Sequence, residues 1–314
     1  MPTDSPIVVR NPRSGDGERT RQAREIALAR DWEVLDAESG DHTVELAADA
    51  ATRTDTVVAC GGDGTLNKTV QGVREADCLD SVALGVIPAG TGNDFADNIG
   101  IRGVQNAFEV IETGDRRPLD LGVANGRLFL NSCVGGLTAE ASARTSPDLK
   151  QRLGVLAYVL TTLSVARDFE ALELHVTAGP ERDPVWEGDA LMLLIGNGRR
   201  FPGEQRRQAN MEDGLMNVVI IEDLPTLQYL TRGAADRLFR RGASHLTRVK
   251  VSNLHVTHGG APVQFSLDGE IIETAELTAE TSPGAMRFCV GAGYEPSPDD
   301  WGPPRRSNTF TVPV

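Results

Sequence analysis

Two aspartates lie inside glycine-rich loops, where a carboxylate is unexpected. Asp63 stands in GGDGT (61–65), after the apolar run DTVVAC (55–60), and Asp94 stands in PAGTGNDF (88–95). Such loops bind phosphate groups through backbone N–H groups and the N-terminus of the following helix. A carboxylate would repel that anion unless a cation lay between them, and Mg²⁺ is held by one or two carboxylates together with substrate phosphate oxygens. The two loops therefore predict a nucleotide site that uses Mg²⁺.

A third loop of this kind, NPRSG (11–15), follows the apolar run IVVR (7–10). Loops at the carboxyl ends of parallel strands meet at one edge of the sheet, where ligands bind. Neither the Walker pattern GxxxxGK[ST] nor the dinucleotide pattern GxGxxG occurs in the sequence. The alternative is that the glycines only make tight turns. Three such loops after strands, two of them with an aspartate, favour phosphate binding.

The first 120 residues alternate strand-like and helix-like segments, which is typical of a mainly parallel sheet covered by helices. For example, Val44, Ala47, Ala48 and Ala51 recur at helical spacing. The predicted strands are 7–10, 55–60 and 81–88, and the predicted helices are 18–30, 42–53 and a segment around 104–111.

After residue 122 strand-like segments dominate, which predicts an antiparallel sandwich or barrel. The predicted strands are 127–134, 171–178, 189–196, 215–222, 248–253 and 263–269, with helices near 148–167 and 225–240. We therefore expect an α/β domain over 1–122 and a β-rich domain over 123–291. We expect the proline-rich tail, 292–314, to return to the first domain.

The charge of the chain excludes some partners. The 314 residues carry a formal net charge of −14, and their 31 basic residues are 3 lysines and 28 arginines. A nucleic-acid binder would need a basic surface, so no nucleic-acid partner is expected. An acidic surface with so little lysine suits high salt, where screening weakens self-repulsion, and this favours a halophilic source over an ordinary acidic protein.

The cysteines and the N-terminus favour a cytoplasmic protein. The four cysteines form no CxxC pair, which fits buried thiols in a reducing compartment better than disulfides or a zinc site. His255 and His258 stand in a strand-like segment at positions that face opposite sides, which disfavours a metal site there. No secretory signal is visible, and the apolar stretch 153–163 is too short to span a bilayer.

The motifs GGDGTLN and IPAGTGNDFA resemble those of the diacylglycerol kinase catalytic family, which includes bacterial lipid kinases and sphingosine and ceramide kinases. Further segments follow the family's order, and the resemblance covers roughly residues 5–292. GGDGT alone is shared with NAD kinases and phosphofructokinases, whereas PAGTGNDFA and a late DGE are more specific. The further segments are NPRSG (11–15), PLDLGVANGRLFLNSCVGG (118–136), LGVLAY (153–158), IGNG (195–198), MEDGLMNVVII (211–221) and FSLDGE (265–270).

The resemblance implies an NAD-kinase-like α/β domain and a β-sandwich-type domain, with ATP in the cleft between them and a lipid hydroxyl as acceptor. By the same resemblance, Asp63, Asp94 and Asp120 match the family's Mg²⁺ and water network. From the loops and the resemblance together, the expected nucleotide contacts are Asn11, Gly61, Gly62, Gly64, Thr65, Gly90, Thr91 and Asn93.

Phosphoryl transfer still needs a base to accept the hydroxyl proton. The family's DGE falls on Asp268 and Glu270, so both join the expected catalytic residues; Glu270 is the first choice for the base and Asp63 the second. By spacing alone, SLDGE favours a hairpin turn, because Asp-Gly is a common hairpin signal. In the resembling bacterial enzymes a structural magnesium is held by an aspartate and two carbonyls, which match Asp213 and the carbonyls of Asn210 and Leu215. A simple turn before a strand is the equal alternative there.

Two departures from the family concern the substrates. Lys68 stands where the family usually has Glu. After IGNG the family usually shows a glycine cluster and a Pro-x-Ala, and RRFPGEQRRQAN (199–210) stands there instead. The second stretch and 237–241 are rich in arginine, which could contact anionic lipid; a solvated face with ion pairs is the alternative. The arginines of the second stretch are Arg199, Arg200, Arg206 and Arg207, around Phe201.

The sequence therefore predicts an ATP- and Mg²⁺-dependent kinase, cytoplasmic and peripheral to the membrane, that phosphorylates diacylglycerol, a dialkylglycerol or another lipid alcohol. Two alternatives remain: a soluble-substrate kinase of the NAD kinase type, and a non-catalytic nucleotide or lipid sensor on the same fold. A homodimer is expected only by analogy.

Overall fold

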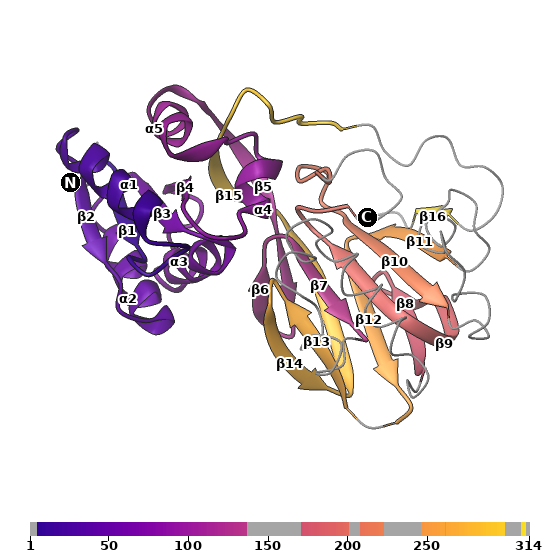
Figure 1. The fold of residues 1–314 in the computed structure, drawn as a ribbon. Coiled ribbons are helices and arrows are strands. Elements are labelled where there is room, and N and C mark those ends of the chain that lie inside the picture. Colours follow the sequence, from indigo (N-terminus) through magenta and orange to yellow (C-terminus); the bar gives the residue numbers. More distant parts are fainter. Residues whose placement is uncertain are drawn as a thin grey trace, which may run out of the picture. The chain divides into compact units, whose positions relative to one another are not determined.

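The computed structural model describes residues 5–136, 171–200, 208–222, 246–260 and 262–298, together with the strand Thr309–Thr311. The chain divides into two compact units, which we call unit 1 and unit 2 (Figure 1). Unit 1 comprises Met1–Leu121, Met211–Asp213 and Ser282–Ser297, and unit 2 comprises Gly122–Asn210, Gly214–Thr281 and Pro298–Val314. The chain first passes from unit 1 to unit 2 after Leu121, one residue before the predicted boundary at residue 122. Unit 1 also includes the two later segments Met211–Asp213 and Ser282–Ser297.

Unit 1 contains a parallel sheet in the order β2-β1-β3-β4, and the end of β15 continues it beside β4. The helices α1 and α5 contact each other, and α2 and α3 contact each other, so right-handed crossovers place the two pairs on opposite faces (Figure 1). The elements are β1 (Ile7–Arg10), α1 (Glu18–Leu28), β2 (Glu33–Asp36), α2 (Gly40–Ala51), β3 (Thr56–Gly61), α3 (Asp63–Glu75), β4 (Ala83–Pro88), α4 (Asp94–Asn98), α5 (Gly103–Thr113) and β5 (Asp115–Ala124).

The sequence explains the two helices that border the loops. The Ser39 side chain accepts a hydrogen bond from the N–H of His42 and caps α2. On α3, Leu66, Val70 and Val73 recur at helical spacing and are fully buried, so this face anchors the helix on the sheet. Because all residues of β3 and β4 are buried, the loops that follow them start from a rigid core.

Unit 2 is rich in strands, and all of its pairings but one are antiparallel in the part of the chain that the structure describes. These strands enclose a core in which Phe129, Leu193 and Val218 are fully buried. The exception is β16, which pairs in parallel with β11. The strands are β6 (Arg127–Phe129), β7 (Ser132–Gly135), β8 (Leu172–Ala178), β9 (Asp183–Gly196), β10 (Met216–Glu222), β11 (Leu246–Val251), β12 (Asn253–His258), β13 (Val263–Leu267), β14 (Glu270–Thr274), β15 (Glu276–Val290) and β16 (Thr309–Thr311).

The predicted fold class, an α/β part followed by a β-rich part of sandwich type, is confirmed. The strand predicted at 127–134 is two strands, because Leu130 and Asn131 turn the chain between β6 and β7. Of the expected tail segment, residues 292–297 are grouped with unit 1, and β16 pairs with β11 of unit 2. The helices predicted near 148–167 and 225–240 lie outside the described residues.

Within the described ranges no helix combines the length and the apolar character that crossing a bilayer requires. The apolar stretch 153–163 lies outside these ranges.

The contact between α2 and α3 generates a stability prediction. A Cβ atom added at Gly72 would lie 2.8 Å from Ala47 Cβ and closer still to the carbonyl oxygen of Val44. Gly72→Ala should therefore lower the free energy of unfolding by about 1–3 kcal/mol, measured by urea titration, because the two helices must move apart. The matched control is Gly64→Ala on the same helix, where a Cβ meets no atom within 4 Å. Equal stability of both variants would contradict this packing.

Candidate active site

The Asp63 side chain joins two of the glycine-rich loops in unit 1. Its Oδ2 accepts a hydrogen bond of 3.0 Å from the N–H of Asp94, and its Oδ1 accepts one of 3.0 Å from the N–H of Phe95. These amides are the first two of α4, where a carboxylate is favourable because the helix N-terminus carries partial positive charge. The carboxylate that looked misplaced in a phosphate loop therefore fastens GGDGT to PAGTGNDF.

The loop PAGTGNDF (88–95) is also stabilised by hydrogen bonds within itself. The Asn93 side chain accepts a hydrogen bond of 3.0 Å from the N–H of Gly90 and donates one of 2.9 Å to the Gly90 carbonyl. A Cβ at Gly62 would lie 3.2 Å from Gly90 Cα, so these two glycines let the two loops pack backbone against backbone. Among the glycines expected to approach a nucleotide, Gly62 and Gly90 lie close to each other, and Gly64 faces open space. Thr91 lies exposed in the same loop.

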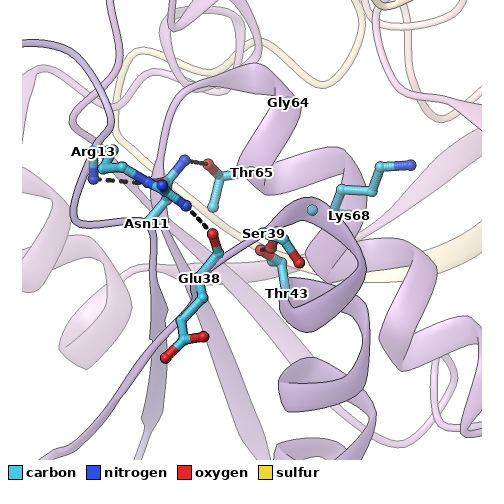
Figure 2. A pocket seen from close by; sticks show the side chains of 9 residues that line it. Asn11, Arg13, Glu38, Ser39, Thr43, Gly64, Thr65 and Lys68 are labelled. Carbon is cyan, nitrogen blue, oxygen red and sulfur yellow. Dashed lines mark hydrogen bonds between the residues drawn. The ribbon is translucent and has the colours of Figure 1, made fainter.

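A cavity of about 210 Å³ opens beside the first loop (Figure 2). Asn11, Gly64 and Thr65, three of the expected nucleotide contacts, lie together in its wall. Asn11 donates a long hydrogen bond of 3.5 Å to the hydroxyl of Thr65, a buried residue. The remaining lining residues are Arg13, Glu38, Ser39, Gly40, Thr43 and Lys68.

The cavity is suited to an anion or to a ligand rich in acceptors. It lies at the N-termini of both α2 and α3, whose first backbone N–H groups carry partial positive charge. Arg13 contacts the carbonyl of Glu38, and Figure 2 shows the Glu38 carboxylate directed away from Asn11 and Thr65. Lys68 runs along the wall above Gly40, and its ammonium donates to Gln71 at 3.4 Å. Lys68, which stands where the family usually has Glu, therefore adds a second basic residue beside Arg13 to the cavity wall.

A partly buried clamp of Arg117, Glu212 and Tyr294 holds the Met211–Asp213 segment within unit 1. Arg117 makes a two-pronged ion pair with Glu212, at 2.6 and 2.7 Å, and the Tyr294 hydroxyl donates to Glu212 at 2.8 Å. Burial raises the pKa of Glu212, but its hydrogen bonds from Arg117 and Tyr294 lower it more, so the pKa lies below its ordinary value. Burial and the Glu212 hydrogen bond raise the pKa of Tyr294, so its hydroxyl stays a donor.

Asp120 joins this clamp through the backbone. Its N–H donates to the Met211 carbonyl at 2.7 Å, and its Oδ1 accepts from the N–H of Gly284 at 2.8 Å. The Asp120 side chain is 2% exposed, so it is a structural as well as a candidate metal-binding group.

Among the described residues, no three side chains of His, Cys, Asp or Glu gather into a metal-binding cluster. Asn210, Asp213 and Leu215 lie in the loop that precedes β10.

In unit 2 the DGE motif forms a two-residue hairpin between β13 and β14. Asp268 accepts hydrogen bonds from the backbone N–H groups of Leu130, Asn131 and Ser132, at 2.5, 3.0 and 2.9 Å. Glu270 is the first residue of β14 and is exposed. By spacing alone the turn was expected, and it forms. The carboxylate of Asp268, one of the expected catalytic residues, binds main-chain amides in this structure.

The arginine stretch is described only at its start. Arg200 is 5% exposed and donates to the Pro298 carbonyl at 3.1 Å, so it is not on a face that could meet a membrane. The backbone of Arg199 forms an isolated bridge with Gln208. Arg206, Arg207 and the 237–241 cluster lie outside the described residues.

Sequence reasoning missed several of the residues that build the site. Ser39, Gly40 and Thr43 line the cavity, and the only signal for them was a serine that could cap the predicted helix. Nothing in the sequence paired Arg117 with Glu212, because 95 residues separate them.

Comparison with known proteins places these features in a family. The model of the diacylglycerol kinase catalytic domain matches residues 5–124, and the model of the YegS C-terminal NAD kinase beta sandwich-like domain matches residues 131–290. A protein of Pseudomonas aeruginosa named "Probable lipid kinase YegS-like" is 36% identical over 306 residues, which cover 93% of this chain and 96% of that protein. One of the same name from Stenotrophomonas maltophilia is 34% identical over 279 residues, 84% of each chain.

Solved structures show the same fold at low identity. The crystal structure of a diacylglycerol kinase from Bacillus anthracis superposes with a TM-score of 0.71 at 18% identity, over 93% of this chain and 98% of that one. Another structure from the same organism reaches a TM-score of 0.77 at 20% identity, over 94% and 98% of the two chains.

The fold and the matched domains together define the class of this chain: a kinase with a diacylglycerol kinase catalytic domain followed by an NAD kinase-like β-sandwich domain. More narrowly, the chain belongs to the YegS-like lipid kinase family. The family resemblance predicted from the loops and from DGE is confirmed.

The Glu212 clamp generates a prediction about pH. Because the pKa of Glu212 lies below its ordinary value of 4.5, its stabilising effect is present above about pH 4.5 and is lost as the pH falls through the lowered pKa. Glu212→Gln should lower the free energy of unfolding by about 1–2 kcal/mol at pH 7, measured by urea titration, and this penalty should shrink as the pH falls below 4.5 and through the lowered pKa. The control is Glu109→Gln, an exposed glutamate on α5. A penalty that stays constant with pH would contradict the clamp.

Proposed function

We propose that this chain transfers the γ-phosphoryl group of ATP to the hydroxyl of a lipid alcohol, in a reaction that depends on Mg²⁺. The observation that carries the proposal is the cavity at two helix N-termini, lined by Asn11, Gly64 and Thr65, in a chain of the lipid kinase family. The acceptor would be diacylglycerol, a dialkylglycerol or another lipid alcohol.

The cavity residues fit a nucleotide. Gly64 leaves space for a ligand to approach the backbone, and the Asn11 amide and the Thr65 hydroxyl present hydrogen-bonding groups to it. Arg13 and Lys68 supply positive charge on the same wall. We expect Asn93 and Gly90 to act indirectly, by shaping the second loop, because their polar groups bind each other.

The carboxylates of unit 1 fit Mg²⁺ held partly through water. Both oxygens of Asp63 already accept an amide hydrogen, and one oxygen of Asp120 does the same, so each retains only part of its ligand capacity. Mg²⁺ keeps several of its waters, which suits such partners together with Asp94. When bound, it would neutralise charge that develops on the phosphoryl oxygens. A structural magnesium at Asp213 and the carbonyls of Asn210 and Leu215 remains part of the proposal.

Glu270 is the better candidate for the base. Its side chain is exposed at the start of β14 and can meet an acceptor, whereas both oxygens of Asp63 are engaged by amides of α4. A lipid acceptor also implies that the protein works at the membrane surface as a peripheral, cytoplasmic enzyme. Homodimerisation remains a proposal by analogy.

The deciding experiment is a panel assay with radiolabelled ATP and Mg²⁺ against diacylglycerol, a dialkylglycerol, a total lipid extract and NAD. We expect labelled product with at least one lipid and none with NAD, and no product when EDTA removes the metal. Product with NAD alone would support a soluble-substrate kinase. ATP binding without any product would support a sensor, and either result would overturn the proposal.

Replacement of the proposed base gives a sharper test. Glu270→Gln should lower kcat by about 10²–10⁴-fold, because a general base contributes that much to the rate. Its KM for ATP should change less than about twofold, because the base acts on the acceptor hydroxyl and not on the bound nucleotide. Near-normal turnover would remove Glu270 as the base and return attention to Asp63.

A further inference from the structure

Glu270 follows a two-residue hairpin turn whose backbone suits Asp-Gly. Leu267 pairs with Glu270, and the two residues between them have positive φ angles of 48° at Asp268 and 104° at Gly269. Asp-Gly is the preferred pair for this kind of two-residue turn. The carboxylate of Asp268 is therefore not needed to make the turn and is directed to another part of unit 2.

That carboxylate binds three consecutive amides. The N–H of Leu130 donates to Oδ2, and the N–H groups of Asn131 and Ser132 donate to Oδ1. The N–H of Asp268 returns a hydrogen bond of 3.0 Å to the Ser132 carbonyl. Four hydrogen bonds therefore fasten the tip of the hairpin to this segment. The three that end on the carboxylate are each about twice as strong as a hydrogen bond between neutral groups.

The segment Leu130–Ser132 is itself held on its other side. The Leu130 carbonyl accepts from the N–H of Gly198 at 2.8 Å and from the Asn197 side chain at 3.1 Å. The Asn131 carbonyl accepts from the N–H of Asn197 at 2.9 Å. Leu130 and Asn197 are each 1% exposed. The amides that Asp268 binds therefore belong to a buried and rigid part of unit 2.

Glu270 stands two residues beyond Asp268, on a strand that pairs only with β13 in the part of the chain that the structure describes. Both Gly269 and Glu270 are exposed, so packing contributes little to the position of the hairpin tip. We propose that Asp268 is a positioning residue, which acts through Glu270 by tying the hairpin tip to the buried Leu130–Ser132 segment. The inference rests on the proposed function, in which Glu270 is the base.

The test uses two variants that leave the turn intact. Asp268→Asn keeps the size of the side chain and tolerates the left-handed backbone, and Asp268→Gly removes the side chain without backbone strain should the first variant fail to fold. Each is assayed for kcat and for KM of ATP, alone and combined with Glu270→Gln. The matched control is Glu273→Gln, another carboxylate on β14.

We expect Asp268→Asn to lower kcat about 10–100-fold, because a misplacement of about 1 Å at a reacting group costs that much. KM for ATP should stay within about twofold, and Glu273→Gln should match the unaltered protein. The double variant should be no slower than Glu270→Gln alone, since both changes act on one group.

Other outcomes separate the two proposals. An active enzyme whose kcat is unchanged by Asp268→Asn would overturn the positioning role and leave the kinase function intact. Losses that multiply in the double variant would also overturn it, because Asp268 would then act independently of Glu270. Full activity of Glu270→Gln, or no activity of the unaltered protein on any acceptor, would defeat the proposed function and this inference with it.

Discussion

The arrangement of the two glycine-rich loops of unit 1 depends on a single carboxylate, that of Asp63. Asp63 accepts the first two amides of α4, so the loop after β3 and the loop after β4 are held at one spacing. Hydrogen bonds to a charged group contribute about 1.5–3 kcal/mol each, enough to keep two exposed loops in register. Gly62 and Gly90 can then touch, and Gly64 is left facing the cavity. The glycines make different contributions: some let loops meet, and one leaves room for a ligand.

The same physical device recurs in unit 2. Asp268, like Asp63, precedes a glycine in a motif that looks catalytic, and its carboxylate also binds backbone amides. Phosphoryl transfer relies on positioning and on charge neutralisation more than on covalent chemistry. An enzyme of this kind benefits from carboxylates that fix loops before any substrate arrives. The groups that meet the substrates can then be few, and Glu270 and the cavity wall are the ones the proposal requires.

The sequence predicted the order of the elements well where patterning was strong. Strands β1, β3 and β4 and helices α2 and α5 lie within a few residues of the predicted ranges, because buried apolar runs and helical spacing are local signals. Several elements had no predicted range, among them α3 and β15. Two others, β2 and β5, were missed because their residues alternate or mix charge with apolar side chains. The sequence correctly predicted that Asn11 and Thr65 lie at one site. It could not show that the carboxylates of Asp63 and Asp268 bind backbone amides. Those bonds depend on where two distant segments meet, and Asp268 and Leu130 are 138 residues apart.

The most direct measurement of the central claim is hydrogen exchange at the amides of Asp94 and Phe95, resolved by NMR in the unaltered protein and in Asp63→Asn. If the carboxylate holds these amides, the substitution should accelerate their exchange at least about tenfold, which corresponds to 1.4 kcal/mol. The amides of the buried strand β3 should not change. Unchanged protection at Asp94 and Phe95 would contradict the account, because the two loops would then be held together by something other than Asp63.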